Sequence, residues 1–226
     1  MEKTSVFNLI ILDESGSMSS ATKSTIAGCN EVINVAKSLQ EKHGDTQRSF
    51  ISIYAFQSSG NRPSRYIIKN APTENVAHIT EKDYTPWGST PLYDAVGSTL
   101  VDLKTIADTH EDATAVVTII TDGYENASTQ YNLPALSKLI SELKELGWAF
   151  NFIGANIDVD HVAASMNIDN KMSFDNDEDG TDVMFCKFSK SMEDYHENRI
   201  ASEACAPTQS ERLSIRKRIS KKFFTD

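Results

Sequence analysis

Runs of apolar residues alternate along the chain with segments in which apolar residues recur every three or four positions. The first run, residues 6–12 (VFNLIIL), is almost continuously apolar. Such runs are typical of strands buried on both faces of a parallel sheet, whereas the wider spacing predicts amphipathic helices. The pattern predicts strands at 5–12, 48–56, 65–68, 114–121, 148–154 and 172–174, and helices at 19–43, 91–109, 132–146, 159–166 and 180–203.

This alternation predicts an α/β fold with a doubly wound, mostly parallel central sheet and helices on both faces. The segment Arg65-Tyr66-Ile67-Ile68 follows its neighbour through a short Gly/Pro turn, so we expect it to be an antiparallel edge strand. No run approaches the roughly 20 apolar residues of a membrane helix, so no membrane span is expected. We expect one domain over residues 1–204 and a basic C-terminal tail or terminal helix over residues 205–226.

Oxygen-bearing side chains follow two of the predicted buried strands. Asp13, Ser15 and Ser17 come directly after the first strand, Asp122 follows a later one, and Thr90 precedes a proline at the start of a predicted helix. Ligands of open parallel sheets sit in the crevice beyond the carboxyl ends of the strands, so we expect these side chains to lie together. Carboxylates and hydroxyls are hard ligands that suit Mg²⁺, Mn²⁺ or Ca²⁺ and suit zinc poorly.

With Asp13-x-Ser15-x-Ser17, Thr90 in a Gly-x-Thr-Pro-Leu context, and Asp122 followed by glycine, the chain resembles the von Willebrand factor A domain family. In that family these five positions form the metal-ion-dependent adhesion site. The resemblance implies that Ser15 and Ser17 bind the ion directly, Thr90 directly or through water, and the two aspartates largely through water. It covers most of the chain and is closest to small stand-alone cytoplasmic A domains of bacteria and phages.

The resemblance and the oxygen ligands together predict a metal-dependent protein-binding module. The ion, Mg²⁺ as first choice with Mn²⁺ or Ca²⁺ as alternatives, keeps a coordination position that a Glu or Asp carboxylate of a partner protein can occupy. Hydroxyl ligands are neutral, so the ion retains the charge that attracts this acidic side chain. Residues bordering the ligands in sequence are expected to shape selectivity: Glu14, Met18, Gly88, Pro91, Tyr124, Glu125 and Asn126.

Two other functions are compatible with the same residues. A metal-dependent hydrolase or phosphotransferase would need a nucleophile or general base near the ion, and no His or Cys lies close to the motifs in sequence. A metal-free scaffold would use the same residues only as turns and helix caps. We expect no enzymatic activity. The five histidines are dispersed and are expected at the surface: His43, His78, His110, His161 and His196.

The charge distribution and the cysteines add further expectations. The chain has a net charge of −10, which argues against binding to nucleic acid. Residues 211–226 are nevertheless basic and carry an apolar stripe. They form either a basic amphipathic helix that meets nucleic acid, an anionic membrane or a partner, or a terminal helix docked by that stripe with its basic residues in solvent. Three cysteines without ligand spacing and an N-terminus without a secretory pattern predict a cytoplasmic protein.

The acidic segment at residues 175–180 begins with the spacing of a calcium-binding loop. Cys186 stands where such a loop needs a bidentate glutamate, and the preceding segment reads as a strand. Clustered acids also favour a helix N-terminus through the helix dipole. A helix-capping role is therefore the better interpretation.

Overall fold

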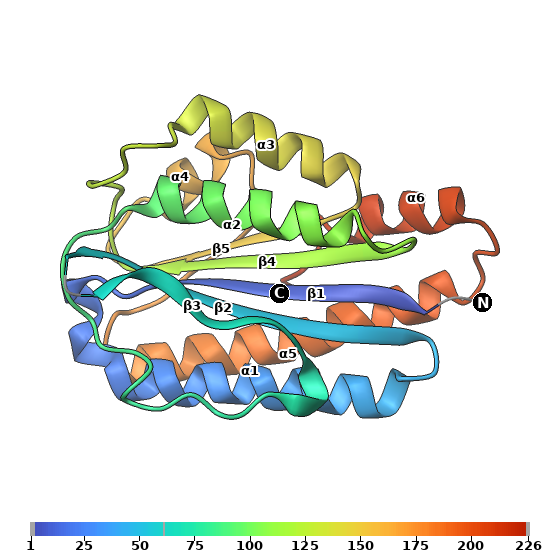
Figure 1. Cartoon of the computed structure of the whole chain (residues 1–226), viewed down its shortest axis with the longest axis horizontal. Helices are drawn as coiled ribbons and strands as arrows, with labels where there is room; N and C mark the ends of the chain where they lie inside the picture. The colour runs from blue at the N-terminus through green and yellow to red at the C-terminus, as the bar shows by residue number, and fades with distance from the viewer. Residues whose placement is uncertain (1–2, 61, 225–226) are drawn as a thin grey trace.

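Six strands form a single sheet in the order β3-β2-β1-β4-β5-β6 in the computed structural model, which describes residues 3–60 and 62–224 (Figure 1). Strand β3 runs antiparallel to β2, and all other neighbouring strands pair in parallel. The predicted fold class, including the antiparallel edge strand, is therefore confirmed. The strands are β1 (Thr4–Asp13), β2 (Gln47–Ser59), β3 (Arg62–Pro72), β4 (Ala113–Thr121), β5 (Ala149–Gly154) and β6 (Asn170–Ser173).

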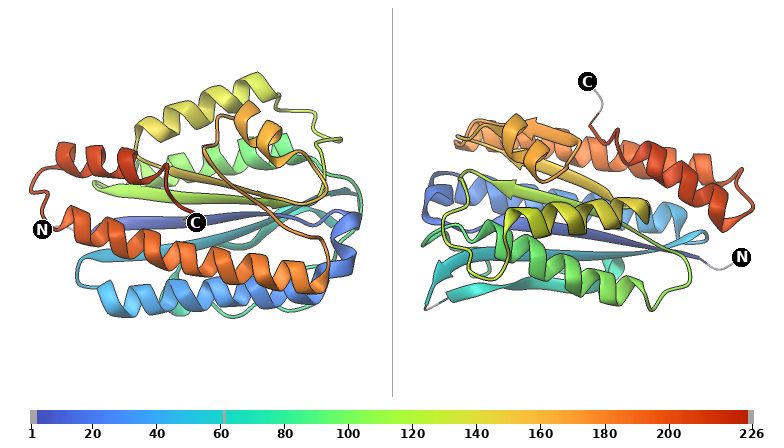
Figure 2. Two further views of the ribbon diagram at one scale, coloured as in Figure 1. Left: turned by 180° about the vertical axis from the view of Figure 1, so that it is seen from behind. Right: turned by 90° about the horizontal axis from the view of Figure 1, so that it is seen from above.

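Helices cover both faces of the sheet, and Figures 1 and 2 show the three layers. One apolar core lies under α2, α3 and α4, and a second lies under α1, α5 and α6. Among the described residues, no helix is both long enough and apolar enough to cross a membrane. The helices are α1 (Thr22–His43), α2 (Leu92–Ala107), α3 (Leu133–Glu145), α4 (Val159–Ser165), α5 (Glu178–Glu203) and α6 (Gln209–Ile219).

Strand β1 lies at the centre of the sheet, between β2 and β4. Helix α1 leads from β1 to β2 on one face, and α2 leads from the β2–β3 hairpin to β4 on the other face. After β4, the chain continues into α3 on the same face as α2. The chain thus leaves the carboxyl ends of β1 and β4 toward opposite faces of the sheet, which opens a crevice between the two strands. Asp13 ends β1 and Asp122 directly follows β4, so the topology brings both carboxylates to this crevice.

The elements differ from their predicted bounds by a few residues at most, and two of these differences have a local cause. The helix expected from residue 19 is preceded by a 3₁₀ helix, η1 (Gly16–Ala21), and α1 begins only at Thr22. Serine side chains compete for backbone hydrogen bonds, which favours a short, tight turn over a regular helix start. Strand β3 is longer than residues 65–68, because its polar outer positions still pair with β2 across several register shifts.

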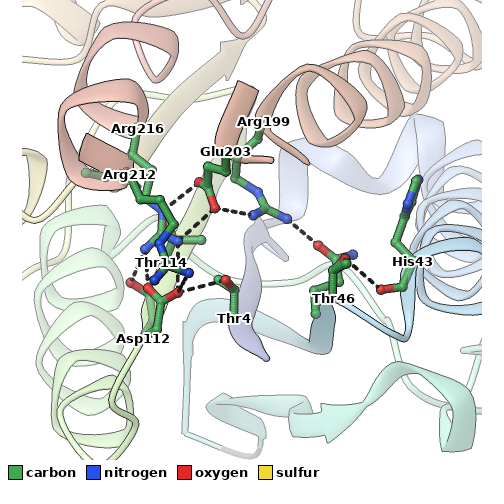
Figure 3. A network of polar contacts seen from close by, with 12 residues as sticks. Thr4, His43, Thr46, Asp112, Thr114, Arg199, Glu203, Arg212 and Arg216 are labelled. Carbon is green, nitrogen blue, oxygen red and sulfur yellow. Dashed lines mark hydrogen bonds and ion pairs between the residues drawn. The ribbon is translucent and has the colours of Figure 1, made fainter. Parts of the chain in front are cut away.

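A buried ion-pair network joins the helices at the amino ends of the strands (Figure 3). In α6, the Arg216 guanidinium donates to the Asp112 carboxylate at 2.7 Å and to the Glu203 carboxylate at 2.7 Å. In α5, Arg199 donates to Glu203 at 3.2 Å and also to the side chain of Gln47. The expectation that the basic residues of the C-terminal segment lie in solvent is wrong for Arg216, because two carboxylates compensate its buried charge.

The apolar stripe of the C-terminal segment packs against the domain. Ile219 and Phe223 are buried in the core under α1 and α5, and Ile215 packs at its edge. The division of the chain at residue 205 stays a prediction.

His196 is buried, which corrects the expectation of a surface histidine. Helix α5 lies across the middle of the sheet, so its central positions are enclosed. The Nε2 atom lies 3.0 Å from Oδ1 of Asn8 on β1. Burial lowers the pKa of His196 to about 3, so the ring is neutral and serves packing.

Candidate metal centre

Asp13 is held rigidly at the carboxyl end of β1. The residue is fully buried, and its Oδ1 accepts the Ser15 backbone N–H at 2.7 Å. Its Oδ2 accepts the hydroxyl of Thr121, the last residue of β4, at 2.6 Å. Buried Tyr84 donates its hydroxyl to the Asp13 carbonyl at 2.7 Å. The carboxylate is therefore fixed between two neighbouring strands before any ligand binds.

The turn after β1 brings two hydroxyls to the second carboxylate. The Oγ atoms of Ser15 and Ser17 lie 3.1 Å apart, and Ser17 Oγ donates to Asp122 Oδ1 at 2.6 Å. Ser15 is the N-cap of η1, and Ser17 is the second residue of this short helix. Four of the five predicted ligands are thus joined by direct hydrogen bonds across β1 and β4.

Thr90 reaches the same edge from the loop before α2. Its backbone N–H donates to Asn126 Oδ1 at 2.8 Å, and the Asn126 N–H returns a bond to the Thr90 carbonyl at 3.2 Å. A methyl group built on Gly123 would lie 3.5 Å from Thr90 Oγ1, so this hydroxyl is next to the residue that follows Asp122. The Gly16 N–H also donates to the Gly88 carbonyl at 3.1 Å, which joins this loop to η1.

The two carboxylates of this crevice have raised pKa values. Burial raises the pKa of Asp13 to about 6, against the lowering effect of its bonds to Thr121 and Ser15. Burial likewise raises the pKa of Asp122, although the Ser17 hydroxyl opposes the shift. Within the described residues, no Lys, Arg or His forms an ion pair with either carboxylate. The ionised form of this pair therefore lacks a compensating positive charge.

The residues fit a hard divalent cation. The donor set contains carboxylate and hydroxyl oxygens, which suit Mg²⁺, Mn²⁺ or Ca²⁺. The described part of the chain has no group of three or more His, Cys, Asp or Glu side chains arranged for a metal, so it offers no zinc-type cluster. Among the described residues, a further amide oxygen, Oδ1 of Asn176 beside Asp122, is buried without a hydrogen-bond partner. Such an atom is available to accept a bond from a water or to contact an ion.

Most of the residues expected to surround the ion serve the fold. Glu14 is buried and accepts two bonds from Arg65 of β3, at 2.6 and 3.1 Å. Met18 is fully buried in the core. Glu125 accepts the backbone N–H groups of Tyr93, at 2.8 Å, and of nearby loop residues. The selectivity role expected for these residues finds no support in these contacts.

Two aromatic side chains remain exposed around the crevice. Trp87 is 70% exposed, and its backbone N–H donates to the Glu14 carbonyl at 2.8 Å, next to Asp13. Tyr124 is 54% exposed, and its hydroxyl accepts the Asp158 N–H at 2.9 Å. Sequence reasoning singled out Tyr124 by adjacency but missed Trp87, although a tryptophan three residues before Thr90 is visible in the sequence.

Sequence reasoning also missed two polar residues that contact the aspartates. Thr121 bonds Asp13, and its position as the polar last residue of an apolar strand was a usable signal. Asn176 donates to Asp122 Oδ2 at 2.6 Å from the segment between β6 and α5. No local pattern indicates this contact, because it depends on how a distant crossover packs.

Solved structures share this fold. No family model matches the chain, and no curated protein matches it in sequence. A von Willebrand factor type A protein from Catenulispora acidiphila superposes with a TM-score of 0.58 at 18% identity, over 84% of this chain and 43% of that chain. The pilus adhesin SpaC from Lactobacillus rhamnosus GG gives 0.58 at 14% identity, over 85% and 30%. Manganese-loaded Plasmodium vivax TRAP protein gives 0.50 at 16% identity, over 81% and 72%.

These likenesses establish a von Willebrand factor A type fold. The identities are too low to carry more than the fold, and this chain spans less than half the length of the first two proteins. One of the three structures holds manganese.

Proposed function

We propose that this chain is a metal-dependent protein-binding module. The ligands are Asp13, Ser15, Ser17, Thr90 and Asp122, and the ion is Mg²⁺, with Mn²⁺ as a close substitute. The observation that carries the proposal is the pair of buried aspartates, Asp13 and Asp122, linked through Ser15 and Ser17. Among the described residues, no cationic side chain forms an ion pair with either of them. A manganese-loaded structural neighbour supports the choice of a divalent ion.

When bound, the ion supplies a positive charge and a coordination position for an anionic group. The protein's own contribution is to hold the ligands in place. Thr121 and the Ser15 N–H fix the orientation of Asp13, and Ser17 fixes that of Asp122. Since the hydroxyl ligands are neutral, an acidic side chain of a partner protein is the best complement to such a site.

The exposed aromatics support a protein as the partner. Trp87 and Tyr124 are among the few large hydrophobic side chains exposed in the described structure, and both flank the proposed ligands in sequence. Tryptophan and tyrosine are enriched at the energetic centres of protein interfaces. A neighbour of the same fold is a pilus adhesin, which agrees with a binding role.

Capture of a partner from native lysate, with Mg²⁺ and with chelator, tests this function. We expect retention only with the ion, and loss in both Asp122→Ala and Thr90→Ala. Thr105→Ala is the matched control, because this threonine is exposed on α2 and bonds only the Val101 carbonyl within its own helix. Changing the critical Glu or Asp of the captured protein to its amide should abolish the binding of that protein. Undiminished capture in chelator and in both variants would contradict the proposal.

We also propose that the module has no catalytic activity. Among the described residues, no histidine or cysteine side chain bonds to any of the five ligands. An enzyme using this crevice would need such a nucleophile or base. We expect no turnover of phosphoester, peptide or nucleotide substrates with Mg²⁺ or Mn²⁺. Turnover that disappears in Asp13→Ala would instead favour a hydrolase.

A cytoplasmic location is part of the proposal. Cys29 is a buried free thiol, and Cys186 and Cys205 are exposed free thiols. Unpaired thiols suit a reducing compartment. The resemblance to stand-alone bacterial and phage A domains stays a prediction.

A further inference from the structure

Asn176 lies in the segment between β6 and α5, far from the predicted ligands in sequence. Its neighbour Asp177 is the N-cap of α5 and accepts the Gly180 N–H at 2.7 Å. The capping role expected for this acidic segment therefore belongs to Asp177. The Asn176 side chain instead contacts the metal centre, where Nδ2 donates to Asp122 Oδ2 at 2.6 Å and to the Ser17 carbonyl at 3.3 Å.

The contact is reciprocated by the backbone. Ser20 in η1 donates its hydroxyl to the Asn176 carbonyl at 3.3 Å. The segment before α5 and the turn after β1 are thus tied together by two hydrogen bonds, and a third bond from Asn176 reaches Asp122 after β4. Such reciprocal bonds restrict both loops more than a single contact would.

Asn176 donates to the oxygen of the Asp122 carboxylate that Ser17 does not contact. A carboxylate has about four lone-pair positions, so both oxygens keep acceptor capacity for a further partner. An amide is suited to this role because it donates a hydrogen bond without adding a charge. A lysine would neutralise the site, and an aspartate would repel Asp122.

We propose that Asn176 is a positioning residue of the metal centre, which fixes the Asp122 carboxylate and closes the site on the side of α5. The inference rests on the proposed function, because it requires that the five ligands bind an ion. Residues that orient metal ligands by hydrogen bonding typically change metal affinity by about 10- to 100-fold when they are replaced. We expect a loss of this size when the Asn176 amide is removed.

The test measures Mn²⁺ binding by isothermal titration calorimetry for the wild type, Asn176→Ala and Asn176→Ser. Both variants should bind Mn²⁺ about 10- to 100-fold more weakly. At saturating Mn²⁺, the electron paramagnetic resonance spectrum of Asn176→Ala should differ from that of the wild type, because Asp122 is less restricted. Asn198→Ala is the matched control, since this asparagine is exposed on α5 and bonds only Ser202. It should bind like the wild type.

The metal-free melting temperature of each variant separates positioning from stability. A lower melting temperature with unchanged Mn²⁺ affinity would mean that Asn176 only anchors its loop, and would overturn the inference. Unchanged affinity and spectrum in both variants would overturn it as well. If the wild type itself binds no Mn²⁺ or Mg²⁺, the proposed function fails and the inference with it. That result differs from the outcome in which the wild type binds Mn²⁺ and both variants bind it equally well.

Discussion

Buried carboxylates stand at both ends of the central sheet, but their charges are balanced in different ways. At the amino ends of the strands, Asp112 and Glu203 face the guanidinium of Arg216. At the carboxyl ends, the bonds to Asp13 and Asp122 in the described structure come from hydroxyl, amide and backbone groups. Side chains of the described residues compensate the buried negative charge at the amino ends of the strands, but not at the carboxyl ends.

The pKa values of the two ends diverge accordingly. Burial by itself would raise the pKa of Asp112, but bonds from Arg216 outweigh it and hold the pKa below its usual range. Burial dominates at Asp13 and raises its pKa to about 6. The comparison separates two uses of a buried acid. A buried acid that pairs with an arginine joins elements of the fold, whereas a buried acid without such a partner favours the binding of a cation from solution.

The largest expected effect comes from breaking the paired end. Arg216→Met should lower the free energy of unfolding by about 3–5 kcal/mol, because Asp112 and Glu203 stay buried without their cation. Lys217→Met is the control on the same helix, since Lys217 pairs with Glu145 at 2.7 Å in solvent and should contribute at most about 1 kcal/mol. Urea unfolding measures both. Equal, small losses would mean that the network is not essential for docking α6.

The second effect is the pH dependence of the unpaired end in chelator. The pKa of Asp13 rises from 3.8 to about 6 on folding, so the folded state binds the extra proton between these values. The contribution of Asp13 to the free energy of unfolding is complete below about pH 4 and is lost as pH rises through about 6. The loss is about 3 kcal/mol, because the pKa shift is about two units. The difference in unfolding free energy between the wild type and Asp13→Asn isolates the contribution of Asp13. A difference that does not change between pH 4 and 7 would contradict the assignment.

The opposite sign is expected at Asp112. Its lowered pKa means that the stability it contributes is present above the unfolded value and is lost as pH falls through the folded value. Lowering the pH should therefore reduce the stability that Asp112 contributes at the paired end and increase the stability that Asp13 contributes at the unpaired end.

The third effect is stabilisation by the ion. A ligand that binds only the folded state at a hundredfold excess over its Kd contributes about 2.7 kcal/mol. At pH 7, Mg²⁺ or Mn²⁺ should raise the melting temperature of the wild type, and Asp122→Ala should abolish the rise. Arg216→Met should retain it, because its network lies at the other end of the sheet. An unchanged melting curve across millimolar Mg²⁺ and Mn²⁺ would remove the basis for the metal centre.

The sequence pattern was sufficient for the sheet, its antiparallel edge and the meeting of Asp13, Ser15, Ser17 and Asp122 at one end of the sheet, whereas their role as ion ligands stays a prediction. These follow from local rules, since strand ends in a parallel sheet meet at one edge. The contacts of Asn176 with Asp122 and of Arg216 with Asp112 could not be predicted, because Asn176 lies in a crossover loop and Arg216 lies on a helix, and the strand-end rule places neither of them. Local periodicity says that a residue faces the core, not which buried charge it meets there.

Adjacency in sequence was also a poor guide to the surroundings of the ion. Glu14 follows Asp13, but its carboxylate pairs with Arg65 of β3, whereas Asp13 bonds Thr121 of β4. Trp87 and Tyr124 remain exposed because the backbone and hydroxyl bonds that hold them leave their rings in solvent. The surface of the crevice therefore depends on loop packing, which composition does not reveal.

The smallest expected effect concerns these exposed rings. Trp87→Ala should weaken binding of the captured partner by about 1–2 kcal/mol, because an exposed aromatic side chain that becomes buried at the centre of an interface contributes apolar contacts that alanine lacks. Its unfolding free energy should change by no more than about 0.5 kcal/mol, since the indole is largely in solvent. Mn²⁺ affinity should be unchanged, because no atom of the indole belongs to the ligand set. Val101→Ala, an exposed apolar residue on α2, is the control and should bind the partner normally. If Trp87→Ala binds the partner as well as Val101→Ala does while Asp122→Ala does not, recognition depends on the ion alone, and the aromatic residues beside the crevice lie outside the interface.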